Sequence, residues 1–435
     1  MDGRQEGQDG GGSSGGSLIL TNIGELATPL GRSARSGAQM GQLLRIKNAG
    51  VVVDKGVISF CGEMSDPAFC DKLDQAKREG FPILDANGMA CAPGFIDCHT
   101  HFIFAGTRED EFFWRANGLP YMEIHRRGGG ILRTVEATRK ASQTELLELG
   151  SKRLESMLCQ GITTVESKSG YGLDLDTEVR ILETAKALQA TTPVDLVSTY
   201  LGPHAVPPEF LGDPEAYLEF VIHTVLPAVR SRNLAQFADV FCEDGVFDLE
   251  QSRRYLLAAR ELGFHLKLHA DEMAPLGGAG LAAELSATSA DHLLKAADAD
   301  LLAMARAGTI AVCLPLTAFA LREPFARARF MIDNGLAVAL ASDFNPGSCY
   351  SQSVPLLFAL AVLYMNLTID EALTGLTLNA AAALGLAQTT GSIEAGKKAD
   401  MVLLDAPSCD FLAYNVATNL VKTVLKAGTV VYTRA

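Results

Sequence analysis

Between residues 95 and 343, short runs of β-branched and apolar residues alternate with segments that have a helical period. The candidate strands are FIDCHTHF (95–102), TTVES (163–167), DLVSTYL (195–201), FADVFCED (237–244), HLKLHAD (265–271), TSADHL (288–293), TIAVCLP (309–315) and LAVALASD (336–343). Residues 173–189 and 248–263 are typical of the helices between them, because acids open each segment and apolar residues recur every three or four positions. This alternation favours a (β/α)8 barrel. An open doubly wound sheet is the alternative, although no GxGxxG sequence follows the first strand.

The two ends of the chain carry β-hairpin patterns instead. GVVVDKGVISFC (50–61) has two β-branched runs around a DKG turn, and DMVLLD (400–405) and VKTVLKAGTVVYT (421–433) repeat this pattern. Because short hairpins are unstable alone, we expect both ends to build one small β-sandwich domain. The expected boundaries are a disordered Gly/Ser tail at 1–17, the small domain at 18–92 and 391–435, and the catalytic barrel at 93–390.

Composition and charge exclude several classes of partner. A net charge of −14 at pH 7 argues against nucleic acid or an anionic membrane surface. The nine cysteines are odd in number and form no CxxC pair, which argues against a disulfide framework and indicates a reducing compartment. The N-terminus lacks the order of a signal peptide, and no apolar run is long enough to span a membrane. We therefore expect a cytoplasmic protein.

Two histidines stand one residue apart in the first predicted strand. Side chains at alternate positions of a strand share a face, so His99 and His101 should point the same way, with Cα atoms roughly 6–7 Å apart. His269 ends the fifth predicted strand and Asp343 ends the eighth, and parallel strands meet at the mouth of a barrel. Three histidines and an aspartate suit zinc or another divalent transition metal.

Glu272 and His292 add groups for proton transfer at the same mouth. Glu272 follows His269 by three residues, and His292 ends the sixth predicted strand. A carboxylate beside a metal-activated water takes its proton and delivers it to a leaving nitrogen. A neighbouring histidine orients the water or stabilises developing oxyanion charge. The pattern therefore predicts a metal-dependent hydrolytic site.

Longer motifs resemble a known family. PGFIDCHTH (93–101) and ASDFNPGS (341–348) resemble the amidohydrolase superfamily. The motifs that more specifically resemble the imidazolonepropionase family are HTHFIFAGTREDEF (99–112), YMEIHRRGGGI (121–131), ESKSGYGLDLDTE (166–178), GPHAVP (202–207), HADE (269–272) and SDFNPGS (342–348). This resemblance, which runs from about residue 90 to residue 405, implies hydrolytic ring opening of 4-imidazolone-5-propanoate to N-formimidoyl-L-glutamate in histidine degradation.

The resemblance also implies a role for each matching residue. The positions that match the ligands of one divalent or trivalent ion, zinc or iron, are His99, His101, His269 and Asp343. The matches to catalytic groups are Glu272, His292 and Asp343. The matches to substrate-binding positions are Arg108, Tyr171, His204, Glu272, Asn345, Gly347 and Ser348. A small substrate with a carboxylate tail suits binding by an arginine. The resemblance to the family also implies a homodimer.

Two other functions fit part of the pattern. Another amidohydrolase, such as an aminoazole or purine deaminase, would use the same metal ligands, but a neutral base has no need for a carboxylate-binding Arg108. A non-catalytic protein of the same fold typically loses metal ligands, and this chain keeps all four matching positions. Release of ammonia would favour the deaminase, and failure to bind metal would favour the non-catalytic protein.

Lys168 and Glu243 bear on the number of metal ions, and Lys267 predicts a buried ion pair. Some relatives bridge two ions with a modified lysine, and Lys168 follows the second predicted strand. No lysine ends the fourth strand, where Glu243 stands, so one ion is expected. Lys267 is predicted to be buried in an ion pair with Glu166 or Glu243.

Overall fold

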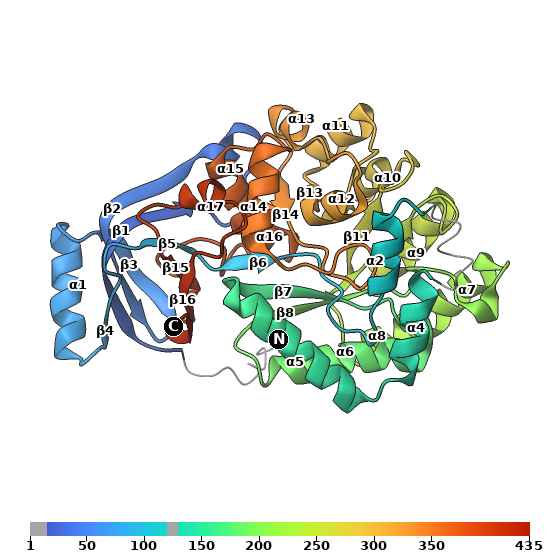
Figure 1. Ribbon diagram of the computed structural model, residues 1–435, viewed down its shortest axis with the longest axis horizontal. Helices are drawn as coiled ribbons and strands as arrows, with labels where there is room; N and C mark the ends of the chain where they lie inside the picture. The colour runs from blue at the N-terminus through green and yellow to red at the C-terminus, as the bar shows by residue number, and fades with distance from the viewer. Residues whose placement is uncertain (1–14, 120–128) are drawn as a thin grey trace, which may run out of the picture.

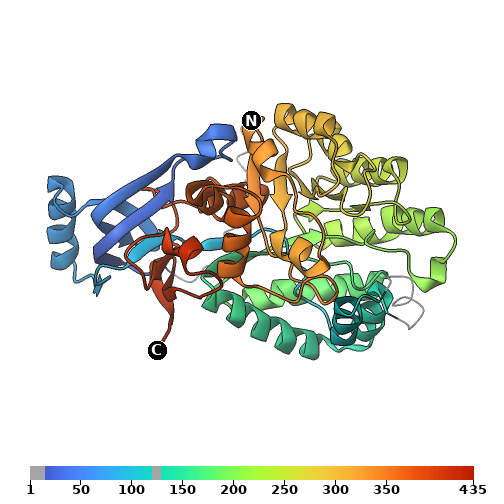
Figure 2. The ribbon, with the colours of Figure 1, turned by 45° about the horizontal axis from the view of Figure 1, so that its top comes forward.

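A parallel sheet curves into a barrel-like wall in the computed structural model, which describes residues 15–119 and 129–435. Helices cover its outer side (Figure 1, Figure 2). The strands pair in the order β6-β7-β8-β9-β11-β12-β13-β14, with β10 beside β11. Their bounds are β6 Phe95–Asp97, β7 Ile162–Lys168, β8 Asp195–Tyr200, β9 Phe237–Ala238, β10 Phe241–Cys242, β11 His265–Ala270, β12 Ser289–His292, β13 Ile310–Cys313 and β14 Val338–Leu340. Spatial order follows chain order, so the predicted (β/α)8 class is confirmed.

Helices follow most of these strands. The helices between β6 and β14 are α2 Glu109–Ala116, α4 Ile131–Lys140, α5 Gln143–Cys159, α6 Leu175–Gln189, α7 Pro214–Phe220, α8 Leu226–Ser231, α9 Leu249–Glu261, α10 Gly278–Glu284, α11 Asp298–Ala307, α12 Pro315–Leu321 and α13 Ala328–Asp333. Those after β14 are α14 Val354–Leu363, α15 Ile369–Leu376, α16 Leu378–Ala383 and α17 Phe411–Tyr414. The two helices predicted from sequence are α6 and α9, and Asp174 and Asp248 cap their first turns.

The barrel closes between its first and last strands just beyond their ends. The N–H of Asp343 donates to the carbonyl of His99 at 3.0 Å, and the N–H of His101 donates to the carbonyl of Phe344 at 2.9 Å. Thr100 also forms a parallel bridge with Phe344. We call this junction the seam. It makes the sheet continuous around the barrel and so excludes the open doubly wound alternative.

A buried carboxylate supports the seam one step below. Oδ1 of Asp97 accepts the N–H of Ser342 at 3.0 Å, and Oδ2 accepts the Ser342 hydroxyl at 2.5 Å. The Ser342 oxygen in turn accepts the N–H of Phe344 at 3.0 Å. Burial raises the pKa of Asp97 to about 6, and these hydrogen bonds oppose that rise.

Strands from the two chain ends form one mixed, mainly antiparallel sheet beside the barrel, with α1 Pro67–Arg78 at its far side (Figure 1). The order is β17-β16-β15-β5-β1-β2-β3, and β4 pairs with β1. The bounds are β1 Leu18–Pro29, β2 Leu43–Asp54, β3 Val57–Glu63, β4 Ile83–Asp85, β5 Ala90–Pro93, β15 Met401–Leu404, β16 Val421–Lys426 and β17 Thr429–Thr433. Both predicted hairpins form, because Lys55-Gly56 and Ala427-Gly428 adopt the positive φ angles that their two-residue turns require. The domain boundaries stay predictions.

Two predicted strands differ in the structure, and two other expected segments lie partly outside the described residues. The strand predicted at 95–102 ends at Asp97, and His99 and His101 lie on the segment beyond it. The strand predicted at 237–244 is split into β9 and β10, and between them the N–H of His269 is shared by the Asp239 carboxylate and the Val240 carbonyl, each at 3.1 Å. Residues 1–14 of the expected tail and 121–128 of the YMEIHRRGGGI motif lie outside the described residues.

Of the helices in the described ranges, none combines the length and the apolar character needed to cross a membrane. All nine cysteines are free thiols.

We predict that Ser342→Ala lowers the free energy of unfolding by about 1–3 kcal/mol, because a buried carboxylate oxygen and a backbone N–H both lose their partner. Urea denaturation monitored by circular dichroism measures the change. The matched control is Ser231→Ala, whose hydroxyl bonds at an exposed site and which should change stability by less than about 0.5 kcal/mol. Equal effects of the two substitutions would contradict this account of the seam.

Candidate active site

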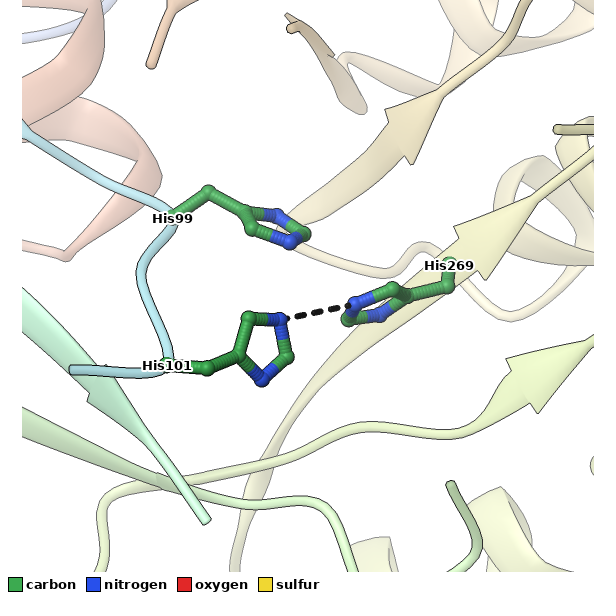
Figure 3. Close-up of side chains that lie close together, drawn as sticks. All are labelled: His99, His101 and His269. Carbon is green, nitrogen blue, oxygen red and sulfur yellow. Dashed lines mark hydrogen bonds between the residues drawn. The ribbon is translucent and has the colours of Figure 1, made fainter. Parts of the chain in front are cut away.

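The seam brings the predicted metal ligands together at the mouth of the barrel. His99 and His101 project from the segment after β6, and His269 projects from β11 toward them (Figure 3). Nε2 of His99 and Nε2 of His101 lie 3.5 and 3.6 Å from Oδ1 of Asp343. Nε2 of His269 lies 3.5 Å from Nε2 of His101. The four predicted ligands therefore converge, and all four are buried.

The spacing of these atoms fits one metal ion. A tetrahedral ion with bonds of about 2.0–2.2 Å holds its ligand atoms roughly 3.3–3.6 Å apart. Burial lowers the pKa of His99, His101 and His269 well below the ordinary value, so the rings are neutral and offer lone pairs. Nε2 of His99 is buried without a hydrogen-bond partner among the described residues. Burial also raises the pKa of Asp343 to about 7, and a bound cation would keep this carboxylate ionised.

Two buried aspartates orient the histidine rings. Oδ2 of Asp291, on β12, lies 2.6 Å from Nδ1 of His99. Oδ2 of Asp239, which follows β9, lies 3.0 Å from Nδ1 of His269. The hydrogen bond from Asp291 keeps the proton of His99 on Nδ1 and leaves Nε2 as the ligand atom, which is a common arrangement behind metal-bound histidines. Asp239 contacts Nδ1 of His269 without a hydrogen bond to it. Neither aspartate was predicted from the sequence, where the available signal was an acid within or next to a buried strand.

A charged cluster lies directly beneath these aspartates. Nζ of Lys168 is 2.7 Å from Asp239 Oδ2, 3.2 Å from Glu166 Oε2 and 3.3 Å from Asp291 Oδ2. Burial alone would lower the pKa of Lys168, but these three carboxylates raise it above its ordinary value. Lys267 lies 3.1 Å from Oε1 of Glu166, so its predicted ion pair is the one with Glu166.

Glu272 and His292 lie together at one side of the ligands. Oε1 of Glu272 is 3.5 Å from Nδ1 of His292. Burial and the charge of Asp343 raise the pKa of Glu272 to about 8. Burial lowers the pKa of His292 to about 4, and neither of its ring nitrogens has a hydrogen-bond partner among the described residues. His292 also forms a second possible ligand group with His99 and Asp343.

The Glu272 loop is held by a residue whose role the sequence left open. The carboxylate of Glu243 accepts the backbone N–H groups of Glu272, Met273 and Ala274 at 2.9–3.0 Å. Glu243 therefore makes no pair with Lys267, which was its alternative predicted partner.

Arg108 lies at another side of the mouth, at the start of α2. Its Nε and one terminal nitrogen donate to Oε2 of Glu111 at 3.0 and 2.8 Å. Its other terminal nitrogen packs so closely on Gly347 that a Cβ atom there would come within 2.3 Å of it. Both residues line a cavity of about 770 Å3, together with Ser348 and the exposed Phe112. The contact between Arg108 and Glu111 was not predicted from the sequence, although Glu111 lies one helical turn after Arg108.

Tyr171 and His204 lie beside the predicted ligand His101. The His204 ring stacks on His101 with centroids 5.1 Å apart, and Tyr171 lies 5.8 Å from the His101 ring. Nδ1 of His204 donates to the carbonyl of Gly170 at 3.0 Å, which leaves Nε2 free to accept or bind. Burial lowers the pKa of His204 to about 4. These two predicted substrate-binding residues are therefore adjacent to His101, one of the predicted metal ligands.

Asn345 is engaged within its own loop. Its Nδ2 donates to the Asp343 carbonyl and the Ser348 hydroxyl at 2.7 and 2.8 Å. Its Oδ1 accepts the N–H groups of Gly347 and Ser348, each at 2.8 Å. Asn345 thus shapes the loop that carries Gly347 against Arg108.

The backbone is strained at His292, at Leu293 next to it, and at Asp343. His292 and the following Leu293 have φ angles of 74° and 62°, and Asp343 has a φ of 53°. The left-handed region costs a residue with a side chain roughly 1–2 kcal/mol. Strain of this kind gathers at sites where side chains must be aimed in a set direction.

Comparison with known proteins places the chain in a family. The model described as "Amidohydrolase family" matches residues 115–432. Imidazolonepropionase of Clostridium tetani is 50% identical over 420 residues, which cover 97% of this chain and 99% of that protein. Imidazolonepropionase of Porphyromonas gingivalis strain W83 is 51% identical over 420 residues, with 96% and 98% covered.

Solved structures of lower identity share the fold. An adenosine deaminase from Xanthomonas campestris with bound zinc has a TM-score of 0.69 at 18% identity, with 95% of this chain and 92% of that chain covered. Escherichia coli guanine deaminase has a TM-score of 0.67 at 14% identity, with 96% and 100% covered. These likenesses concern architecture alone, whereas the identity to the first two relatives extends along nearly the whole chain. The chain belongs to the amidohydrolase family and, within it, to the imidazolonepropionases.

Proposed function

We propose that the protein hydrolyses the ring amide of 4-imidazolone-5-propanoate and releases N-formimidoyl-L-glutamate, a step of histidine degradation. The observation that carries the proposal is the convergence of His99, His101, His269 and Asp343, of which three pairs of ligand atoms lie 3.5–3.6 Å apart, with Glu272 and His292 beside them. The relatives named above, at about half identity over nearly the full chain, support the same activity.

One metal ion would be held by His99, His101, His269 and Asp343. Zinc and iron both suit three imidazoles and a carboxylate. When bound, such an ion supplies Lewis-acid chemistry that makes water acidic enough to attack near neutral pH. The ion pairs of Lys168 with three carboxylates leave it no role as a bridge between two ions, which supports a single ion.

Glu272 is positioned to move the proton. It accepts a proton from the attacking water as the carbon–oxygen bond forms, and it returns this proton to the ring nitrogen as the carbon–nitrogen bond breaks. The raised pKa of Glu272 suits this double task, and a cation beside Asp343 would bring the pKa down toward neutrality. His292, neutral and unpaired, is placed to orient the water or to stabilise the oxyanion.

The propionate tail fits the Arg108 side of the mouth. A guanidinium already anchored by Glu111 and backed by Gly347 has little freedom left to lose when it binds a carboxylate. Tyr171 and His204 would hold the ring between Arg108 and the metal ligands. Ser348 lines the same cavity, and Asn345 would act by holding the loop. A cytoplasmic location and a homodimeric state stay predictions.

The first test follows the ultraviolet absorbance of freshly prepared 4-imidazolone-5-propanoate with purified protein of known metal content. We expect loss of the ring chromophore without release of ammonia. A chelator should remove the activity, and zinc or iron should restore it, because ligands of this type bind metal reversibly. Ammonia release would indicate a deaminase instead, and no reaction with a full metal site would overturn the proposed substrate.

We predict that Glu272→Gln lowers kcat by at least about 100-fold while metal content and substrate binding are kept, because the amide cannot carry the proton. Steady-state kinetics and metal analysis measure both quantities. Glu183→Gln is the matched control, since Glu183 is an exposed acid paired with Arg232 on the surface. Full turnover in Glu272→Gln would remove Glu272 from the mechanism.

We predict that Arg108→Ala raises KM by about 10–100-fold with a smaller effect on kcat, because a charge-assisted hydrogen bond to the substrate is lost. Arg108→Lys should raise KM less, since it keeps the charge but loses the fork of donors. The control is Arg133→Ala, because Arg133 forms a half-exposed ion pair with Asp110. An unchanged KM in Arg108→Ala would contradict the carboxylate-binding role.

A further inference from the structure

A single buried ammonium group links two of the metal ligands. Nζ of Lys168 lies 2.7 Å from Asp239 Oδ2, and this same oxygen lies 3.0 Å from Nδ1 of His269. Nζ also lies 3.3 Å from Asp291 Oδ2, and that oxygen lies 2.6 Å from Nδ1 of His99. The chain of contacts thus runs from one ligand through its carboxylate to Lys168 and on to the second ligand. All five side chains are buried.

We propose that Lys168 is a positioning residue that sets the orientation of His99 and His269 through Asp291 and Asp239, and thereby sets the affinity of the site for its metal ion. The inference rests on the proposed function, because it concerns the same ion. On this proposal Lys168 not only neutralises the nearby carboxylates but also fixes their orientation toward the two histidine rings.

Lys267, the second buried lysine, provides a comparison for the positioning role of Lys168. Lys267 is equally buried, but the carboxylate it pairs with is Glu166, and it stands over the Phe237 ring. Glu166 accepts the Thr199 hydroxyl and lies 3.2 Å from Lys168, so Lys267 is separated from the predicted ligands by more contacts than Lys168 is. The barrel therefore holds two lysines of similar burial, of which Lys168 contacts the carboxylates behind the ligands.

Removal of Lys168 would leave Asp239 and Asp291 without their shared cation. The carboxylates would then be free to turn, because the oxygens that contact Lys168 are the same oxygens that face Nδ1 of His269 and Nδ1 of His99. The rings would lose the contacts that fix their orientation. Outer partners of metal-binding histidines typically change metal affinity by about 10–100-fold when they are replaced.

The test compares metal affinity in the wild type, Lys168→Met and Lys267→Met by competition with a chromophoric zinc chelator. We expect Lys168→Met to bind zinc about 10–100-fold more weakly. We expect Lys267→Met to lose thermal stability but to keep its affinity within about threefold, because its partner contacts no ligand. Lys168→Gln is measured as well, so that a Met variant that fails to fold does not prevent the comparison.

A spectroscopic measurement separates positioning from general destabilisation. The visible absorption of the Co2+-loaded protein reports ligand geometry, so it should shift in the Lys168 variants and stay unchanged in Lys267→Met. Unchanged affinity and spectrum in a folded Lys168 variant, or equal losses in the two lysine variants, would overturn the inference alone. A wild-type protein that binds no ion would overturn the proposed function together with it.

Discussion

The seam between His99–His101 and Asp343–Phe344 is the junction on which the rest of the structure depends. Its backbone hydrogen bonds make the sheet continuous, and three of its residues are predicted metal ligands. Closure of the barrel and assembly of the ligand set are therefore a single structural event. A shift of one residue in the pairing would turn the histidines away from the mouth, because side chains alternate in direction along an extended segment. Asp97 and Ser342 resist such a shift from below.

Buried carboxylates impose order on the loops around the mouth. Glu178 accepts the N–H groups of Gly170, Gly172 and Leu173 around Tyr171, and Glu243 does the same for the Glu272 loop. Loops lack the hydrogen-bond ladders of strands, so their buried N–H groups need such acceptors. Glu178 lies in α6 and Glu243 directly follows β10, so each carboxylate ties its loop to a regular element of the barrel and restricts the motion of that loop. This explains how a site built mostly on loops and strand ends keeps a fixed geometry.

The sequence predicted the barrel, and the four predicted ligands lie together in the structure, because both depend on local patterns. Strand periodicity revealed the eight strands, and a histidine or aspartate at a strand end must lie at the mouth of a barrel. The contacts of Lys168 could not be predicted, because they depend on how β7, β9 and β12 are arranged around the barrel interior. For the same reason, the sequence left two candidate partners for Lys267, Glu166 and Glu243, and the structure shows the pair with Glu166. Asn345 looked like a substrate contact, but its polar atoms bond within its own loop, which spacing alone could not show.

The left-handed backbone at His292, Leu293 and Asp343 has a consequence for how such a chain can evolve. Glycine at position 293 would relieve strain without removing a functional side chain, yet it would also free the segment that aims His292. Glycine at position 292 or 343 would relieve the same strain and abolish the group itself. Selection for a more stable fold and selection for turnover thus oppose each other at these positions. Stabilising substitutions should accumulate instead in the outer helices, where the backbone is relaxed and no ligand depends on it.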